Sequence, residues 1–135
     1  MLEKLNKIIQ HLPENSIITG GLGLSLHGIN LKRSIGDIDI ILPYFSPITL
    51  GDPLPVEYSS GNDFDYQYKV SIPEVGICII DMKINPKAKW EIVTYNNMVF
   101  KVAPICDILY YKAKYAMKGN IKHINDIKNI LKYGV

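Results

Sequence analysis

The sequence lacks several features that would assign it to whole classes of protein. No uninterrupted apolar stretch approaches the ~18 residues of a membrane-spanning helix, so we expect no membrane segment. The chain has 15 basic and 13 acidic residues, and a net charge of +2 is too balanced to predict a nucleic-acid-binding surface from charge alone. Lysine is more frequent in the last third than in the middle, which leaves a local basic groove open. Internal repeats and low-complexity tracts are also missing from the sequence.

Cysteine is scarce, and the two examples are Cys78 and Cys106. Each lies in an apolar run that contains isoleucine, so we interpret both as small buried hydrophobic residues and not as a disulfide pair. Residues 1–4 carry charges at helical spacing and begin no long apolar core, so we expect no signal peptide. A reducing, cytoplasmic location is the resulting expectation.

The spacing of apolar residues and helix breakers predicts the elements of the first half. Leucine and isoleucine recur at helical spacing over residues 2–12, and Pro13 ends this helix. Next we expect, in order, a strand at 17–19, a short helix that ends at Gly28, a strand at 37–42 and an irregular, proline-rich loop at 43–55.

The pattern of the second half predicts two hairpins followed by helices. We expect strands at 65–72 and 76–84, joined by a turn at 73–76, and strands at 90–95 and 98–102. The second hairpin turns at Asn96-Asn97, because asparagine tolerates positive φ. From residue 105 the spacing is helical, and Gly119-Asn120 separates two C-terminal helices. This order predicts a single α+β domain over residues 1–135, with helices packed on a mixed β-sheet.

Two carboxylates open the strand at 37–42. Asp37 and Asp39 are two residues apart, so on a strand their side chains point to the same face. Their charges repel each other, and Mg²⁺ or Mn²⁺ relieves this repulsion because such hard cations prefer carboxylate oxygens and keep water and phosphate as other ligands. The rest of this strand is isoleucine and leucine, and a buried strand with two aspartates requires a reason. The alternative is a strand-edge Asp next to a turn Asp.

A glycine pair, Gly20-Gly21, lies between the strand at 17–19 and the short helix. Glycine at such a junction lets the backbone approach a ligand closely. N–H groups at the start of a helix can then hold phosphate oxygens. Glycine pairs are also common turn residues, so the significance of this pair comes from its combination with the acidic pair.

The combination resembles the nucleotidyltransferase superfamily, which has the polymerase-beta-like fold. The matching residues are Ile17-Ile18-Thr19-Gly20-Gly21 and Arg33-Ser34-Ile35-Gly36-Asp37-Ile38-Asp39-Ile40-Ile41. The resemblance implies a third carboxylate on a later strand. Asp81, in Ile79-Ile80-Asp81-Met82, fits that position as a metal ligand and general base. The chain is similar in particular to small stand-alone members, including AbiEii-type toxins and minimal antitoxin-like enzymes.

Two C-terminal segments extend the resemblance to about residue 127. Residues 104–112 resemble the family segment that carries a lysine on its first C-terminal helix, and residues 122–127 resemble the following basic pair and Asp. The resemblance implies that Lys112 and Lys122 neutralise a triphosphate. The alternative for the second segment is a surface pair between Lys122 and Asp126, which are spaced i,i+4.

Arg33 and three tyrosines lie close to these motifs. Arg33 precedes Asp37 by four residues, and by the same resemblance it contacts a phosphate or braces the acidic strand. The alternative is a solvated loop arginine. The tyrosines at 110, 111 and 115 fit ordinary helix packing.

Asp63 and Asp65 form a rival acidic pair. If the hairpin turns at 73–76, Tyr68 lies roughly opposite Asp81, and both rival residues face away from Asp81. A change of register by one residue reverses this orientation. We prefer a turn and strand-start role for both.

The resemblance implies nucleotidyl transfer from a nucleoside triphosphate. Asp37 and Asp39 would hold the metal, Asp81 would assist attack by an acceptor hydroxyl, and Gly20 and Gly21 would cradle the β- and γ-phosphates. The sequence leaves open which triphosphate is used, and whether the acceptor is an RNA end, a protein side chain or a small molecule. Two other functions stay open: an antitoxin-like protein that works by binding a toxin partner, and a nucleotide-binding module without turnover.

Overall fold

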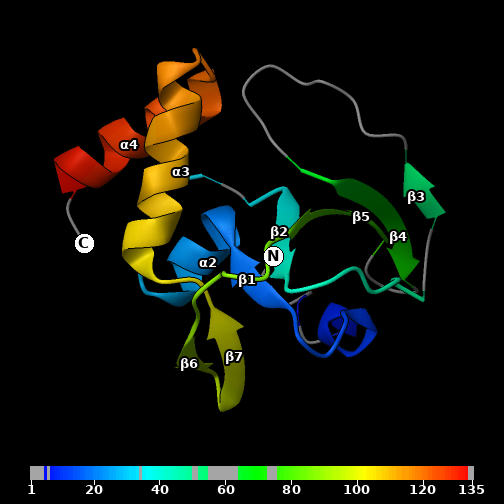
Figure 1. Cartoon of the computed structure of the whole chain (residues 1–135). Coiled ribbons are helices and arrows are strands. Elements are labelled where there is room, and N and C mark those ends of the chain that lie inside the picture. The colour runs from blue at the N-terminus through cyan, green and yellow to red at the C-terminus, as the bar shows by residue number, and fades with distance from the viewer. Residues whose placement is uncertain are drawn as a thin grey trace.

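The computed structural model describes residues 5, 7–33, 35–49, 52–54, 64–72 and 76–133. Its strands form one seven-stranded mixed sheet in the order β3-β4-β5-β2-β1-β7-β6 (Figure 1). They are β1 (Ile17–Thr19), β2 (Asp37–Leu42), β3 (Asp52–Leu54), β4 (Tyr66–Ile72), β5 (Gly76–Ile84), β6 (Glu91–Tyr95) and β7 (Met98–Val102). The helices are η1 (Ile9–His11, a 3-10 helix), α2 (Gly20–Leu26), α3 (Ile105–Met117) and α4 (Ile121–Tyr133). An α+β fold with a mixed sheet and two C-terminal helices is thereby confirmed.

The turns explain why most of the expected elements are confirmed. Asn96 and Asn97 both have positive φ, 48° and 63°, as a two-residue turn between β6 and β7 requires. Gly28 ends the α2 segment with φ of 93°. The expectation of a loop throughout 43–55 is wrong, because residues 52–54 form β3. This strand lies at the edge of the sheet. An edge strand tolerates proline, because the backbone N–H that proline lacks would face outward, where no neighbouring strand accepts a hydrogen bond.

Several expectations concern residues outside the described ranges. These are the first turn of the N-terminal helix at residues 1–4 and 6, the turn at 73–75, and Asp63. Among the residues that the structure does describe, no helix is both long and apolar enough to cross a membrane.

The centre of the sheet is the parallel pair of β2 and β5. In its register Asp39 lies beside Asp81. On the other side of β2, the antiparallel strand β1 places Thr19 opposite Asp39. Sequence-distant polar residues thus meet at one level of the sheet.

The hairpin of β4 and β5 has a register one residue away from the expected one. Gln67, and not Tyr68, lies opposite Asp81. The reason is that the hairpin closes with Ile72 paired to Gly76, so its turn is one residue shorter than the expected 73–76. The expected register, from which Asp65 was predicted to face away from Asp81, is therefore wrong. Asp65 itself precedes β4 and lies outside the lining of the pocket that contains Asp81.

Alternation along β2 and β5 separates two faces of the sheet. One face of the two strands carries only apolar residues, and they join a core that η1 and the residues flanking it complete. The apolar residues of the strands are Ile38, Ile40, Leu42, Cys78, Ile80 and Met82. The other face carries the aspartates, and Ile41 there joins a second core with Ile108 of α3. Figure 1 shows α3 and α4 packed together on one flank, while β3, β4 and β5 curve away on the other.

The two cysteines differ in their surroundings. Cys78 is buried, as expected, whereas Cys106 is exposed, so the expectation of burial is wrong for Cys106. The inward side of α3 is defined by Ile105, Ile108 and Leu109, and Cys106 lies outside that stripe. Neither cysteine is in a disulfide.

Candidate active site

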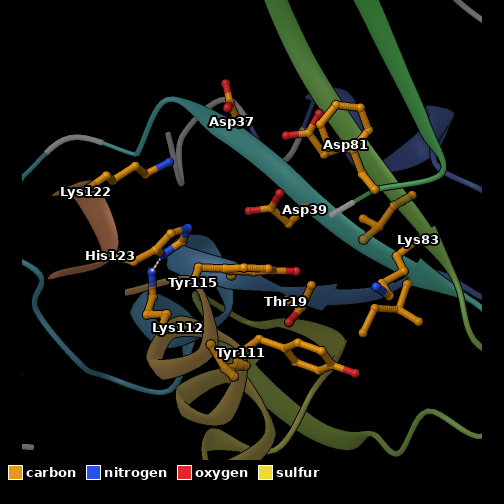
Figure 2. A pocket seen from close by; sticks show the side chains of 15 residues that line it. Thr19, Asp37, Asp39, Asp81, Lys83, Tyr111, Lys112, Tyr115, Lys122 and His123 are labelled. Carbon is orange, nitrogen blue, oxygen red and sulfur yellow. Dashed lines mark hydrogen bonds between the residues drawn. The ribbon is translucent and has the colours of Figure 1, made fainter. Parts of the chain in front are cut away.

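Asp37, Asp39 and Asp81 line one pocket between the sheet and helices α3 and α4 (Figure 2). The pairing of β2 with β5 brings Asp39 beside Asp81. Asp37 lies at the start of β2 on the same strand face. The expectation that these three residues converge on one pocket is confirmed. Figure 2 shows the carboxylates of Asp39 and Asp81 directed into a common space, with that of Asp37 at its margin.

The two adjacent carboxyl groups are costly to ionise together. Burial, followed by repulsion from Asp81, raises the pKa of Asp39 to about 7. Burial also raises the pKa of Asp81, against the opposing effect of the hydrogen bond that Gln67 Nε2 donates to its Oδ1 at 2.9 Å. Asp39 is therefore partly protonated at neutral pH unless a positive charge enters the pocket.

The donor set suits Mg²⁺ or Mn²⁺, since it consists of hard carboxylate oxygens. Among the described residues, no three His, Cys, Asp or Glu side chains are arranged closely enough to hold an ion by themselves. Magnesium in phosphate chemistry commonly has only one or two protein carboxylates and takes water and substrate phosphate for the remainder. Asp39 and Asp81 fit that pattern as the two protein ligands.

Gly20 allows Asp39 to occupy its place in the pocket. Its φ is +65°, and a Cβ added to it would collide with the Asp39 carboxylate and lie 2.9 Å from Cγ. Both the backbone conformation and the available space therefore require glycine. Gly21 is buried outside the pocket lining, where a Cβ would lie 3.2 Å from Nη2 of Arg33. Of the two glycines expected to cradle phosphate, only Gly20 borders the pocket.

Lysines from three elements face the aspartates, namely Lys83 of β5, Lys112 of α3 and Lys122 of α4. Lys122 is exposed, and Figure 2 shows its side chain directed towards Asp37. Lys112 is only 2% exposed. Its Nζ donates a hydrogen bond of 2.6 Å to Oδ2 of Asp126. Burial lowers the pKa of Lys112, although the bond to Asp126 acts in the opposite direction.

Asp126 joins three elements through ion pairs. Its side chain is completely buried. Arg33 contacts it in a bidentate manner, with Nε to Oδ1 and Nη2 to Oδ2 both at 2.7 Å. Burial alone would raise the pKa of Asp126, but the hydrogen bonds from Arg33 and Lys112 outweigh it, so its pKa lies below the ordinary value. Asp126 thereby ties α4 to α3 and to the segment before β2.

This network corrects two alternative interpretations. The surface pair between Lys122 and Asp126 is wrong, because Asp126 is buried and is bound by Arg33 and Lys112. Arg33 is also not a solvated loop residue, since Asp126 holds its guanidinium. Arg33 lies outside the pocket lining, and of the roles expected for it, its position favours bracing over phosphate contact.

Several pocket residues were not expected from the sequence. Tyr111 and Tyr115, interpreted as packing residues, line the pocket together with His123. Their distances of three and seven residues from the buried Ile108 place them on the inward side of α3, and this spacing could have identified them. Burial, followed by repulsion from Lys112, lowers the pKa of His123 to about 4, so it is neutral at pH 7.

Two further contributions depend on strand register. Thr19 reaches the pocket because β1 pairs with β2, and Gln67 reaches Asp81 because β4 pairs with β5. Asp65 lies exposed at the start of β4, and its Oδ2 accepts a 2.7 Å hydrogen bond from the backbone N–H of Ile84. The strand-start role expected for Asp65 is therefore confirmed.

Comparisons of the chain with protein families, with curated proteins and with solved structures give no match. A functional assignment consequently depends on the residues of the pocket and on their geometry.

Proposed function

We propose that the protein is a metal-dependent nucleotidyltransferase with a polymerase-beta-like fold. It would transfer a nucleoside monophosphate from a nucleoside triphosphate to an acceptor hydroxyl: the hydroxyl oxygen bonds to the α-phosphorus, the bond between the α-phosphorus and the bridging oxygen to the β-phosphorus breaks, and pyrophosphate leaves. The observation that carries this proposal is the in-register pair of Asp39 and Asp81 on parallel strands, which faces lysine side chains across one pocket. A triphosphate with its metal ion matches both the carboxylate side and the lysine side of the pocket. The carboxylates need a cation, and the outer phosphates need positive side chains.

The carboxylates would have separate roles in the reaction. Asp39 and Asp81 would hold Mg²⁺ or Mn²⁺, which neutralises triphosphate charge and orients the α-phosphorus. Asp81 would also accept the proton of the acceptor hydroxyl as the general base. Asp37, at the margin of the pocket, would support the same cation through water.

The basic residues would hold the outer phosphates. Lys122 is exposed at the pocket and can approach an anion without leaving a partner in the protein core. Lys112 is engaged by Asp126, so it would contribute mainly by fixing α3 against α4 and by its charge at the pocket wall. Gly20 would keep the Asp39 carboxylate close to the backbone, which leaves room above it for phosphate.

The test is transfer of label from nucleoside triphosphates in the presence of Mg²⁺. Label at the α-phosphorus should appear on an acceptor offered as RNA, protein or a small hydroxyl compound, and label at the γ-phosphorus should not. Asp39→Asn should abolish transfer. Asp107→Asn is the matched control, because Asp107 lies in the first turn of α3 and outside the pocket lining. Transfer of the γ label would instead indicate a kinase.

Binding without transfer would also be informative. If nucleoside triphosphates bind with Mg²⁺ and no acceptor is labelled, the protein is a nucleotide-binding module or an antitoxin-like partner, and the transferase proposal fails.

A further inference from the structure

Two tyrosines of α3 share the pocket with the carboxylates, and neither takes part in the hydrophobic cores. Tyr111 and Tyr115 are one helical turn apart. Their rings stack with centroids 6.3 Å apart and an interplanar angle of 30°. Tyr115 also contacts the ring of His123 on α4, at a centroid distance of 5.1 Å. A continuous aromatic wall therefore extends from α3 to α4 along one side of the pocket.

This wall is built into the pocket and is not a general property of the helix surface. Tyr111 and Tyr115 are half-buried and line the pocket, whereas the adjacent Tyr110 is 65% exposed and lies outside the lining. Other tyrosines of the chain, such as Tyr68, do pack into the main core. Figure 2 shows the ring of Tyr115 between Asp39 and Lys112, with Tyr111 beside it.

We propose that Tyr111 and Tyr115 form a stacking platform for the base of a nucleotide whose phosphates lie at the carboxylates. This inference rests on the proposed function and specifies its substrate: a nucleoside triphosphate recognised through its base, and not through its phosphates alone.

The chemistry of the wall favours a planar ring over any other part of the substrate. A phosphate group gains nothing from an aromatic face, whereas a base gains dispersion and stacking energy from it. The surroundings are cationic, since Lys83 Nζ lies 5.7 Å and Lys114 Nζ 6.0 Å from the ring centroid of Tyr111. The same region therefore suits an aromatic group attached to a polyanion.

Stacking also determines the kind of specificity. Every base has a π-face, so a platform of this type accepts all four bases and favours purines through their larger ring system. The ligand class is thus a nucleoside triphosphate with moderate preference for purines.

The experiment compares two ligands that differ only in possessing a nucleoside. With Mg²⁺ present, the affinities of inorganic tripolyphosphate and of the four ribonucleoside triphosphates are measured by calorimetry. Wild type should bind the nucleotides more tightly than tripolyphosphate. Tyr111→Leu and Tyr115→Leu should each weaken nucleotide binding by about five- to 140-fold, and should leave tripolyphosphate affinity unchanged. Tyr115→Phe retains a ring and should retain nucleotide affinity. Tyr44→Leu is the matched control, with no effect on either ligand, because Tyr44 is exposed and lies outside the pocket lining.

The outcomes separate the platform from the proposed function. Equal affinity of wild type for tripolyphosphate and for nucleotides overturns the platform, while the triphosphate site stands. Equal losses for both ligands in the leucine variants also overturn it, because the tyrosines would then act through the shape of the pocket. If no triphosphate of either kind binds, the proposed function and the platform fail together. Melting curves accompany each variant. If a leucine variant does not fold, methionine replaces leucine at that position, because it is flexible and fills similar space without a ring, and the same loss of nucleotide affinity is expected.

Discussion

Lys112 and Asp126 form a buried ion pair at 2.6 Å between α3 and α4, and Arg33 binds both oxygens of the same carboxylate. Lys112 therefore has a structural role in addition to its position on the pocket wall. Removing one member of a buried, hydrogen-bonded charge cluster leaves the others insufficiently compensated, which is more costly than losing a surface pair.

The first prediction follows from this pair. Lys112→Ala should lower the free energy of unfolding by about 1.5–3 kcal/mol, because Asp126 loses a charge-assisted hydrogen bond but keeps Arg33. Lys122→Ala should change stability by less than ~0.5 kcal/mol, since Lys122 is exposed. Urea unfolding of both variants measures the difference. Triphosphate affinity should show the reverse order, with the larger loss in Lys122→Ala. Equal stability of the two variants would contradict the structural role of Lys112.

The second prediction concerns the close approach at Gly20. Gly20→Ala should destabilise the protein through two effects, the positive φ and the collision with the Asp39 carboxylate. Gly28→Ala is a matched control, because Gly28 also has positive φ but a methyl group added there would meet no atom within 4 Å. The difference between the two variants, expected at about 1–3 kcal/mol, isolates the collision. Comparable unfolding midpoints for the two would show that Asp39 moves aside without cost.

Much of the fold was predictable because its signals are local. The bounds of β2 and β5, the Asn96-Asn97 turn and the break at Gly119 all follow from apolar runs and from residues that tolerate positive φ. The strand β3 was missed because an edge strand in a proline-rich segment has no periodic signal of its own. Its existence depends on pairing with β4, which is a tertiary effect.

The candidate site was predictable only in part, for the same physical reason. The shared face of Asp37 and Asp39 follows from the two-residue period of a strand, whereas the neighbours of Asp81 depend on register, and an error of one residue exchanged Gln67 for Tyr68. Asp126 looked like half of a surface pair, because only the packing of α4 on α3 shows that it is buried.

The third prediction concerns pH. The raised pKa of Asp39 means that the folded state holds this proton more tightly than the unfolded state, so stability falls as pH rises from about 4 to 7 and stays lower above. Asp39→Asn should remove this loss and stabilise the metal-free protein at pH 8 by on the order of 2–4 kcal/mol. Because the pKa of His123 is lowered, its contribution makes stability rise as pH increases from about 4 to 6.5. This contribution is present in wild type and in Asp39→Asn alike, so it cancels in the difference between their stabilities. Urea unfolding across pH 4–9 measures that difference, and a constant difference would contradict the prediction.

The fourth prediction concerns metal. Millimolar Mg²⁺ or Mn²⁺ should raise the melting temperature at pH 8 by mass action, because binding to the folded state relieves the repulsion at Asp39 and Asp81. The gain should shrink at pH 5.5, where protons compete for the same carboxylates. Asp39→Asn should show no gain at either pH, and Asp107→Asn should behave as wild type. Identical gains in wild type and Asp39→Asn would place the metal elsewhere.

The fifth prediction concerns Gln67, which contacts Asp81 and lies outside the pocket lining. Its Nε2 donates a 2.9 Å hydrogen bond to Oδ1 of Asp81, and this bond favours the charged carboxylate. Gln67→Leu keeps a side chain of similar length but removes the donor, so the pKa of Asp81 should rise further and Mg²⁺ affinity should fall by about 10–100-fold. Calorimetric titration with Mg²⁺ at pH 8 measures this change. Gln10→Leu, on the exposed surface at η1, is the control and should match wild type. Because protonation is the expected cause, the loss in Gln67→Leu should diminish as pH rises to 9, and a loss independent of pH would mean that Gln67 acts only through packing.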